Sequence, residues 1–409
     1  MKKSIIILSV LLFGVVCNSV ARPIKKPTKG APIAEVGKTL PAWSEGCFDI
    51  HFINSARGEC CFYILPDGTT LLVDAGEVVG GPIEVEQRPN AHTRPYITYA
   101  NYIKHFLPSG QKRVDYCVAT HFHTDHIGSV NASTESSRVG YRKSGLLALY
   151  DEVPYGHIFD SAYPDYESYE ISGQLAGDWS KFVRWGAKHK KFKVEQFVPG
   201  EEQITMLKNA DKYKNFSILN ICAKGRVLGV DQEGNTRAIG KVPTTLANSA
   251  SCGFHLRYGA FDYIACGDLV SSAQNRVAYY FRDFIGRGKL DAFKCHHHLA
   301  GNSWGIKMQE VNFDPRVVMD HCFTNNKPNV DKLIHVLPVV EAFYATNLHP
   351  DIIASPVVKE HKLMDRITAY NGHIVLRVAP GGGEFYVYML DDGDFEYRVK
   401  SIHGPYLSK

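Results

Sequence analysis

The stretch HFHTDH, residues 121–126, directly follows the apolar run DYCVAT, residues 115–120. We expect the apolar run to form a strand, because short runs of this kind are typical of buried strands. On an extended segment the side chains at i and i+2 point the same way. We therefore expect His121 and His123 to bind one metal ion together.

Asp125 and His126 complete the stretch where the expected strand ends and a helix begins. We expect both side chains to face a second metal ion nearby. Imidazole and carboxylate together are ligands of zinc, manganese or iron(II), whereas magnesium and calcium prefer all-oxygen sites. Three histidines and one acid at this spacing contribute nothing to an apolar core. The stretch therefore predicts a metal centre.

The spacing HxHxDH resembles the signature of the metallo-β-lactamase superfamily, and three other stretches match that family's landmarks in order. TLLVDAG, residues 70–76, resembles its strand ending in Asp-x-Gly, whose aspartate, here Asp74, braces the metal-binding loop. FDYIACGD, residues 261–268, ends with Asp268 at the position of the carboxylate that bridges two metals. DAFKCHHH, residues 291–298, offers the last histidine ligand. The resemblance implies an α/β protein with the four-layer αββα fold, two mixed sheets between helices.

One ligand of the family has no clear counterpart in this chain. Many members place a histidine in a Gly-His-Thr-like turn before the bridging aspartate, but residues 246–259 here are LANSASCGFHLRYG. His255 lies between two apolar positions of a strand, which favours a surface or interlayer side chain over a ligand. Asn248, His157 or water could complete the first metal site, which would then bind its ion less tightly than the second.

With this departure, the sequence resembles the subfamily that contains the metallo-β-lactamase-like domain of bacterial DNA-uptake (competence) channel proteins. That subfamily shares the order Asn-x-x-Ser, an apolar strand, Tyr-Gly and Gly-Asp. Residues 49–59 resemble its first strand and turn, although the usual Gly-Gln-Gly-Asp is replaced by ARGE at residues 56–59. Residues 291–298 resemble its Asp-Val-Leu-Lys-x-x-His-His-Gly segment, with Leu299 and Ala300 in place of Gly-Ser. The resemblance extends from about residue 46 to residue 395.

The resemblance implies a binuclear site whose metal ligands are His121, His123, Asp125, His126, Asp268 and His297. Asp125, Asp268 and His298 take the catalytic roles, and neutral His298 or His296 would protonate the leaving group. The expected cofactor is a pair of divalent ions, Zn²⁺ first and Mn²⁺ as the alternative. Two such cations share a bridging hydroxide and clamp the attacking and leaving oxygens of a displacement. Phosphodiesters, lactones, thioesters and lactams are all cleaved by sites of this kind.

The subfamily resemblance favours hydrolysis of a small or polymeric phosphodiester, such as extracellular nucleic acid or an ester of the cell envelope. The chain has 46 basic and 42 acidic residues, a formal net charge of +4. This balance does not support nucleic-acid binding by the chain as a whole. The alternatives are a lactonase, thioesterase or β-lactamase-type hydrolase, or a non-catalytic metal-binding protein of the envelope.

Residues 1–21 have the pattern of a secretory signal peptide. Lys2 and Lys3 precede the apolar residues 4–16, and Ala21 ends a small-x-small cleavage site. Lipoprotein anchoring through Cys17 is less consistent with the sequence, because valine precedes this cysteine. We expect an exported protein, periplasmic or secreted, with a flexible leader at 22–45 and a hydrolase domain at 46–409. No later segment is apolar enough to cross a membrane.

Other elements are expected from periodicity and turn residues. Residues 99–106 and 178–189 have helical patterns, and residues 374–378 and 385–389 form a hairpin around a Gly-Gly-Gly turn. The chain has ten cysteines. Several of them lie in apolar strand-like runs, so a disulfide-rich scaffold is not expected.

Overall fold

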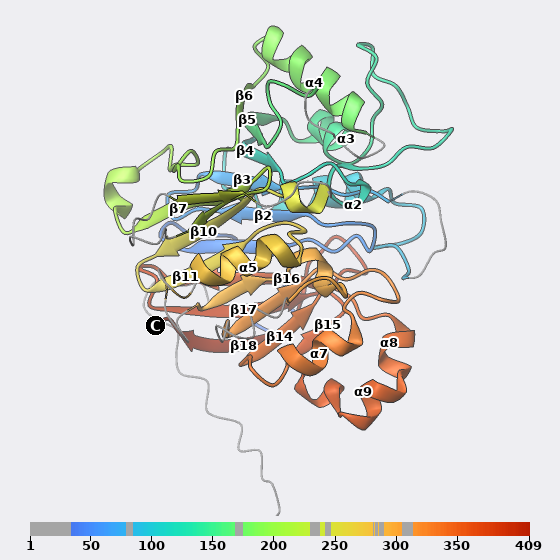
Figure 1. The fold of residues 1–409 in the computed structure, drawn as a ribbon, viewed down its shortest axis with the longest axis vertical. Helices are drawn as coiled ribbons and strands as arrows, with labels where there is room; N and C mark the ends of the chain where they lie inside the picture. The colour runs from blue at the N-terminus through green and yellow to red at the C-terminus, as the bar shows by residue number, and fades with distance from the viewer. Residues whose placement is uncertain are drawn as a thin grey trace, which may run out of the picture.

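The computed structural model describes residues 34–78, 85–167, 175–229, 238–241, 247–280, 282, 285, 290–304 and 314–409. Within these residues the chain forms two nine-stranded sheets (Figure 1). The first sheet has the order β18-β17-β16-β1-β2-β3-β4-β5-β6. Its strands are β1 (Phe48–Phe52), β2 (Cys61–Ile64), β3 (Thr70–Val73), β4 (Val114–Ala119), β5 (Tyr155–Asp160), β6 (Lys193–Gln196), β16 (His373–Val378), β17 (Glu384–Leu390) and β18 (Val399–Leu407).

The second sheet has the order β15-β14-β13-β12-β11-β10-β7-β8-β9. Its strands are β7 (Phe216–Ala223), β8 (Arg226–Gly229), β9 (Ala238–Lys241), β10 (Gly253–Tyr258), β11 (Phe261–Ala265), β12 (Ala292–Lys294), β13 (Val317–Asp320), β14 (Ala342–Ala345) and β15 (Ala369–Tyr370). The two sheets pack face to face. The ring of Phe48 in the first sheet lies 5.6 Å from that of Phe216 and 6.2 Å from that of Phe261 in the second.

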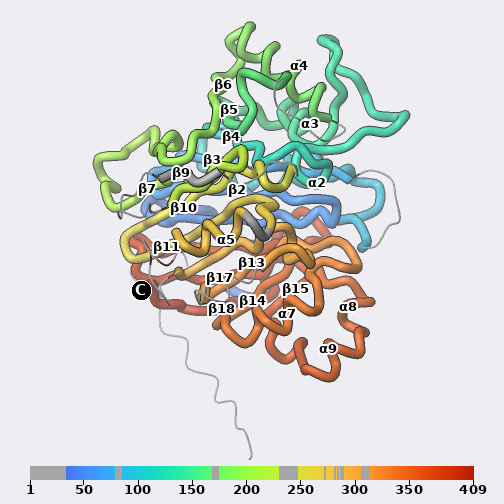
Figure 2. The backbone as a smooth tube through the Cα atoms, viewed as in Figure 1, coloured from blue at the N-terminus to red at the C-terminus, as the bar shows by residue number. Residues whose placement is uncertain are grey.

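Helices cover the outer face of each sheet (Figures 1 and 2). The first sheet shares a buried core with α1 (Pro95–Phe106), α3 (Gly145–Glu152) and α4 (Ala176–Lys188). The second shares another with α5 (Ser271–Tyr280), α7 (Val330–Val336), α8 (Pro350–Ala354) and α9 (Pro356–Glu360). The expected αββα arrangement of two mixed sheets between helices is confirmed.

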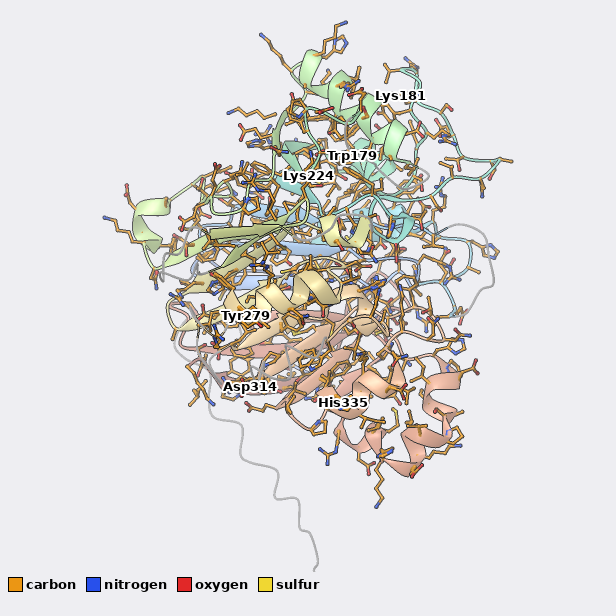
Figure 3. All side chains as sticks on the ribbon, viewed as in Figure 1. Trp179, Lys181, Lys224, Tyr279, Asp314 and His335 are labelled. Atoms are coloured by element: carbon orange, nitrogen blue, oxygen red, sulfur yellow. The ribbon has the colours of Figure 1, made fainter. Side chains whose placement is uncertain are left out.

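The amphipathic pattern of α4 shows why these helices pack as they do. Trp179, Phe182 and Val183 are fully buried against the first sheet, whereas Lys181 is exposed to solvent (Figure 3). Burial of one apolar face stabilises a helix far more than intrinsic propensity does. The helices expected at 99–106 and 178–189, the strand at 115–120 and the hairpin around the Gly-Gly-Gly turn are likewise confirmed, with ends shifted by a few residues.

Parallel pairing brings particular loops to one edge of the molecule. In the first sheet β3 pairs with β4 in parallel, and in the second β11, β12 and β13 do so. The carboxyl ends of parallel strands lie at the same edge of a sheet, where α/β proteins bind ligands. The loops after β3, β4, β11, β12 and β13 carry the residues described in the next subsection.

The start of the described chain packs on the sheet. Gly37 N donates a hydrogen bond to Val399 O at 2.8 Å, and Leu40 is buried. These residues belong to the 22–45 segment expected as a flexible leader, whereas residues 1–33, with the expected signal peptide, lie outside the described residues. Among the described helices, none has the length and apolar character needed to span a bilayer. The nine cysteines of the described residues are buried thiols.

We expect Arg377→Met to lower the free energy of unfolding by about 3–5 kcal/mol, measured by urea denaturation. The Arg377 guanidinium holds Asp49 through two hydrogen bonds of 2.8 and 2.7 Å, and both residues are buried. The substitution leaves the Asp49 carboxylate buried without its partner. Arg398→Met, which removes a surface ion pair with Asp394, is the control and should leave stability unchanged. Equal effects of the two substitutions would contradict the prediction.

Candidate metal centre

The predicted metal ligands converge at the carboxyl edge of both sheets. The loop after β4 supplies four of them, and it includes the short helix α2 (Thr124–Ile127). The loops after β11 and β12 supply the others. The side chain of each of these residues contacts that of at least one other. The structure thus brings together His121, His123, Asp125, His126, Asp268, His297 and His298.

His121 and His123 form the first half of the centre. Nε2 of His121 lies 3.1 Å from Nδ1 of His123. Nδ1 of His121 lies 3.1 Å from the hydroxyl of Thr120, which itself donates to Asp74 at 2.6 Å. The Thr120 oxygen therefore accepts from His121, and Nε2 keeps a lone pair directed toward His123. Two facing nitrogens at this separation match two ligands of one ion with Zn–N bonds of about 2.0–2.1 Å.

His126 belongs to the second half of the centre. Its Nδ1 donates to Asp74 Oδ2 at 2.8 Å, and its Nε2 lies 3.1 Å from Asp268 Oδ2. A carboxylate that holds one nitrogen of a histidine while the other faces a cation is the usual support of a metal-binding imidazole. Asp74 also accepts from the backbone of Thr120 at 2.8 Å. The prediction that Asp74 braces the metal-binding loop is confirmed.

His298 is held in the same manner. Its Nδ1 donates to the carbonyl of His321 at 2.7 Å, so Nε2 is the nitrogen that a cation would displace a proton from and bind. This Nε2 lies 3.4 Å from Asp125 Oδ2 and 3.4 Å from Asp268 Oδ2, and the residue is buried. The sequence assigned the ligand role to His297 and a catalytic role to His298. Of the two rings, that of His298 has its Nε2 3.4 Å from both Asp125 and Asp268, and the choice of ligand between them stays a prediction.

His297 lies beside the same carboxylate but nearer to solvent. Its Nε2 is 3.8 Å from Asp268 Oδ2 and 3.2 Å from Nδ2 of Asn248. Its Nδ1 donates to Asn302 Oδ1 at 2.7 Å. Burial lowers the pKa of His297 to about 4, so the ring is neutral at pH 7. Asn248 is one candidate for the missing ligand of the first site. Its amide contacts the ring of His297, which in turn lies beside Asp268.

A left-handed turn lets both adjacent imidazoles face Asp268. His297, His298 and Leu299 have φ values of 50°, 52° and 51°. Each such residue other than glycine costs about 1–3 kcal/mol of backbone strain, and strain of this kind gathers at functional sites. Leu299 is the residue that the resemblance to the competence-protein subfamily aligned with a glycine, an alignment that stays a prediction. Its side chain is buried among α5, α7 and the second sheet, and this burial offsets part of the strain.

The centre carries an excess of buried negative charge. Burial opposes protonation of His298, but the Asp268 carboxylate outweighs it, and the pKa of His298 rises to about 9. Burial likewise opposes protonation of His126, but the negative charges of Asp268 and Asp74 outweigh it and raise the pKa of His126. Among the described residues, Nε2 of His126, Nε2 of His298 and both oxygens of Asp268 have no hydrogen-bond partner. Buried polar atoms without partners are costly, and divalent cations would satisfy all of these atoms. The residues therefore fit a pair of metal ions.

Glu59 and Lys294 are members of the cluster that sequence reasoning missed. Both are buried, and Nζ of Lys294 lies 2.8 Å from Oε2 of Glu59. A ligand atom of Glu59 lies within 4.8 Å of those of His126, Asp268 and His298. The available signals were the acid that ends the ARGE turn and the lysine of the segment at 291–298.

Two other histidines considered for the first site lie elsewhere. His157 on β5 pairs with Tyr116, five residues before His121 along β4, so roughly 16 Å of strand separates it from the centre. Its ring packs on Phe159. His255 contacts Asp262 at 2.5 Å and the Tyr280 hydroxyl at 2.9 Å, between the second sheet and α5. The interlayer position expected for His255 is confirmed.

Comparisons with known proteins identify the family of this arrangement. The profile described as "Metallo-beta-lactamase superfamily" matches residues 57–305, more than half of the chain. No curated protein matches the sequence. Similar solved structures include CmlA, a diiron β-hydroxylase from Streptomyces venezuelae, at 13% identity and a TM-score of 0.39. The match covers 83% of this chain, which spans about half of CmlA, 55% of its length.

Two further structures have similar scores. Tm1679, a metal-dependent hydrolase of the β-lactamase superfamily, is 13% identical, with 73% of this chain and 95% of that chain covered and a TM-score of 0.39. Igni18, a metallo hydrolase from the archaeon Ignicoccus hospitalis, is 12% identical, with 84% and 100% covered and a TM-score of 0.35.

We expect Gly76→Ala to weaken metal binding by roughly tenfold or more. A Cβ at Gly76 would stand 1.9 Å from the backbone oxygen of Asp125, so the metal-binding loop must shift. The measurement is metal content by mass spectrometry after dialysis against a weak chelator. Gly177→Ala on α4 is the control, because its Cβ meets nothing within 4 Å. Unchanged metal retention in Gly76→Ala would show that the close approach is not needed.

Proposed function

This chain belongs to the metallo-beta-lactamase superfamily, and we propose that it is a binuclear metallohydrolase that cleaves phosphodiesters. The observation that carries the proposal is the position of Asp268 between two groups of buried donor atoms. Its Oδ2 lies 3.1 Å from Nε2 of His126 and 3.4 Å from Nε2 of His298. His121 and His123 face each other beside it, with the ring of His121 4.1 Å from that of His126.

We propose the following distribution of roles. His121 and His123 would hold the first ion, Asp125, His126 and His298 would hold the second, and Asp268 would contact both. When bound, two such cations lower the pKa of water between them and stabilise the attacking and leaving oxygens of an in-line displacement. His297 is left to contact the substrate, because its side chain is 15% exposed whereas that of His298 is 1% exposed. Zn²⁺ or Mn²⁺ would suit the donors.

A lysine at the rim of the centre supports an anionic substrate. Nζ of Lys327 lies 3.9 Å from Oδ2 of Asp125, and its side chain is 20% exposed. An ammonium group in this place attracts a phosphodiester but offers little to a neutral lactone or thioester. The resemblance to the competence-protein subfamily supports the same substrate class. The near-neutral charge of the chain favours a small phosphodiester over a long nucleic acid.

We propose further that the protein acts outside the cytoplasm. The support is the pattern of residues 1–21, with two lysines, an apolar stretch and a small-x-small site. The expected cleavage follows Ala21. N-terminal sequencing of the protein recovered from the periplasm or medium of expressing cells tests this proposal, and recovery only in the cytoplasm with residues 1–21 intact contradicts it.

The proposed activity is tested with bis(p-nitrophenyl) phosphate and added Zn²⁺ or Mn²⁺. We expect metal-dependent release of nitrophenol that falls at least about a hundredfold in Asp268→Ala, because the carboxylate between the two metal sites is lost. Asp365→Ala removes an exposed acid and should behave as the wild type. Turnover of lactones or thioesters without phosphodiester cleavage would replace the proposed substrate class. Absence of both turnover and metal binding would favour a non-catalytic protein.

Lys327→Met should raise the KM for bis(p-nitrophenyl) phosphate by roughly tenfold, because one charge-assisted contact to the anion is removed. Lys327→Arg should recover most of this loss. Steady-state kinetics with the phosphodiester and with an uncharged p-nitrophenyl ester separate binding of the anion from general damage. An equal loss with both substrates would exclude a role of Lys327 in recognising charge.

A further inference from the structure

We propose that Glu59 is an additional ligand of the second metal ion, and that it makes this site oxygen-rich. The inference rests on the metal centre of the proposed function but concerns the identity of the bound metal. Ligand atoms of Glu59, His126, Asp268 and His298 all lie within 4.8 Å of one another, and all four residues are buried. Atoms this close can share one ion with only small movements of the side chains.

The backbone holds Glu59 in register with the metal-binding loop. Its N–H donates to the carbonyl of Asp125 at 2.8 Å, and its own carbonyl accepts from Gly76 at 2.9 Å. Glu59 is therefore placed by the same segments that place Asp125 and His126. The resembling subfamily has aspartate at this turn. The extra methylene of glutamate extends the carboxylate along the edge of the His298 ring, whose outer nitrogen Nδ1, bonded to the His321 carbonyl, lies 3.8 Å from Oε2 of Glu59.

Lys294 compensates the charge of only one of the two oxygens of the Glu59 carboxylate. The ammonium lies 2.8 Å from Oε2 of Glu59 and also donates to the carbonyls of Gly267 at 3.1 Å and Cys295 at 3.0 Å. Oε1 of Glu59 has no hydrogen-bond partner among the described residues. A buried carboxylate oxygen without a partner is costly, and a cation between Glu59, His126 and Asp268 would remove this cost.

A carboxylate ligand from Glu59 would change which metal ion the second site prefers. With Glu59, the second ion has two imidazoles, from His126 and His298, and three carboxylates, from Asp125, Asp268 and Glu59. Zinc usually takes four ligands rich in nitrogen or sulfur, whereas manganese and iron(II) accept more oxygen ligands. We therefore infer that the second site selects Mn²⁺ or Fe²⁺ over Zn²⁺ more strongly than a site without Glu59.

Metal titration of the purified full chain tests this inference without reference to turnover. Mn²⁺ binding is followed by electron paramagnetic resonance, and Zn²⁺ binding by competition with a chromophoric chelator. Glu59→Gln should weaken Mn²⁺ binding at one of two sites by roughly tenfold or more, and Zn²⁺ binding by clearly less. Glu77→Gln removes another buried carboxylate, one bonded to Ser144 and Gly145, and should leave both affinities unchanged.

The double variant Glu59→Gln/Lys294→Gln distinguishes a ligand from a counterion. It removes both charges together, so no buried ion is left without its partner and the fold is spared that cost. If Glu59 is a ligand, the double variant binds Mn²⁺ as poorly as Glu59→Gln. If it binds Mn²⁺ as the wild type does, Glu59 serves only Lys294 and the inference is overturned.

Metal binding and ester hydrolysis together distinguish failure of the inference from failure of the proposed function. A wild-type protein that binds no metal overturns both. Weakened Mn²⁺ binding in both Glu59 variants, with no ester hydrolysed by the wild type, upholds the ligand role of Glu59 and overturns the proposed function. Hydrolysis by a wild type whose Mn²⁺ affinity is unaffected by Glu59→Gln overturns the inference alone.

Discussion

Mutual repulsion of buried carboxylates is the constraint on which the rest of this structure depends. Glu59, Asp74 and Asp268 are buried and Asp125 is half-buried, and the four come from separate loops to meet where the carboxyl edges of two sheets join. Like charges out of water repel one another strongly, so their approach requires positive charge. Lys294 supplies one such charge from within the fold. Metal ions, or protons on histidine, must supply the remainder.

Three imidazoles of the centre, those of His121, His126 and His298, are oriented by a bond on their far side. Thr120, Asp74 and the carbonyl of His321 accept from their outer nitrogens, so that the inner nitrogen of His121 faces His123 and those of His126 and His298 face the carboxylates. These supports belong to both sheets. The centre is therefore a product of the packing of the two sheets, and a change in their separation would disturb the ligand positions before it exposed the core.

The turn from His297 to Leu299 has a left-handed backbone without a glycine. Glycine adopts a left-handed conformation without strain, and leucine does not. Burial of the Leu299 side chain offsets part of this strain, and the same turn places two adjacent imidazoles on one face. Because the left-handed turn directs both side chains toward Asp268, one histidine is buried between the carboxylates while its neighbour lies nearer to solvent.

Sequence alone determined the features that depend on local periodicity and residue chemistry. The alternation of a strand placed His121 and His123 on one side, the apolar runs located the strands, and the order of motifs indicated the family and its αββα fold. The resemblance also predicted that Asp74 braces the loop and that Asp268 bridges two metals, and the second of these stays a prediction. The strands and helices were predictable because each depends on neighbours a few residues apart.

Only the tertiary structure decided which histidine after β12 faces both carboxylates, and that Glu59 and Lys294 belong to the centre. The choice between His297 and His298 depends on a left-handed backbone that propensity does not predict for residues other than glycine. Glu59 lies more than two hundred residues from Asp268 in the chain. Their approach depends on how two sheets pack, a long-range property that no local pattern encodes.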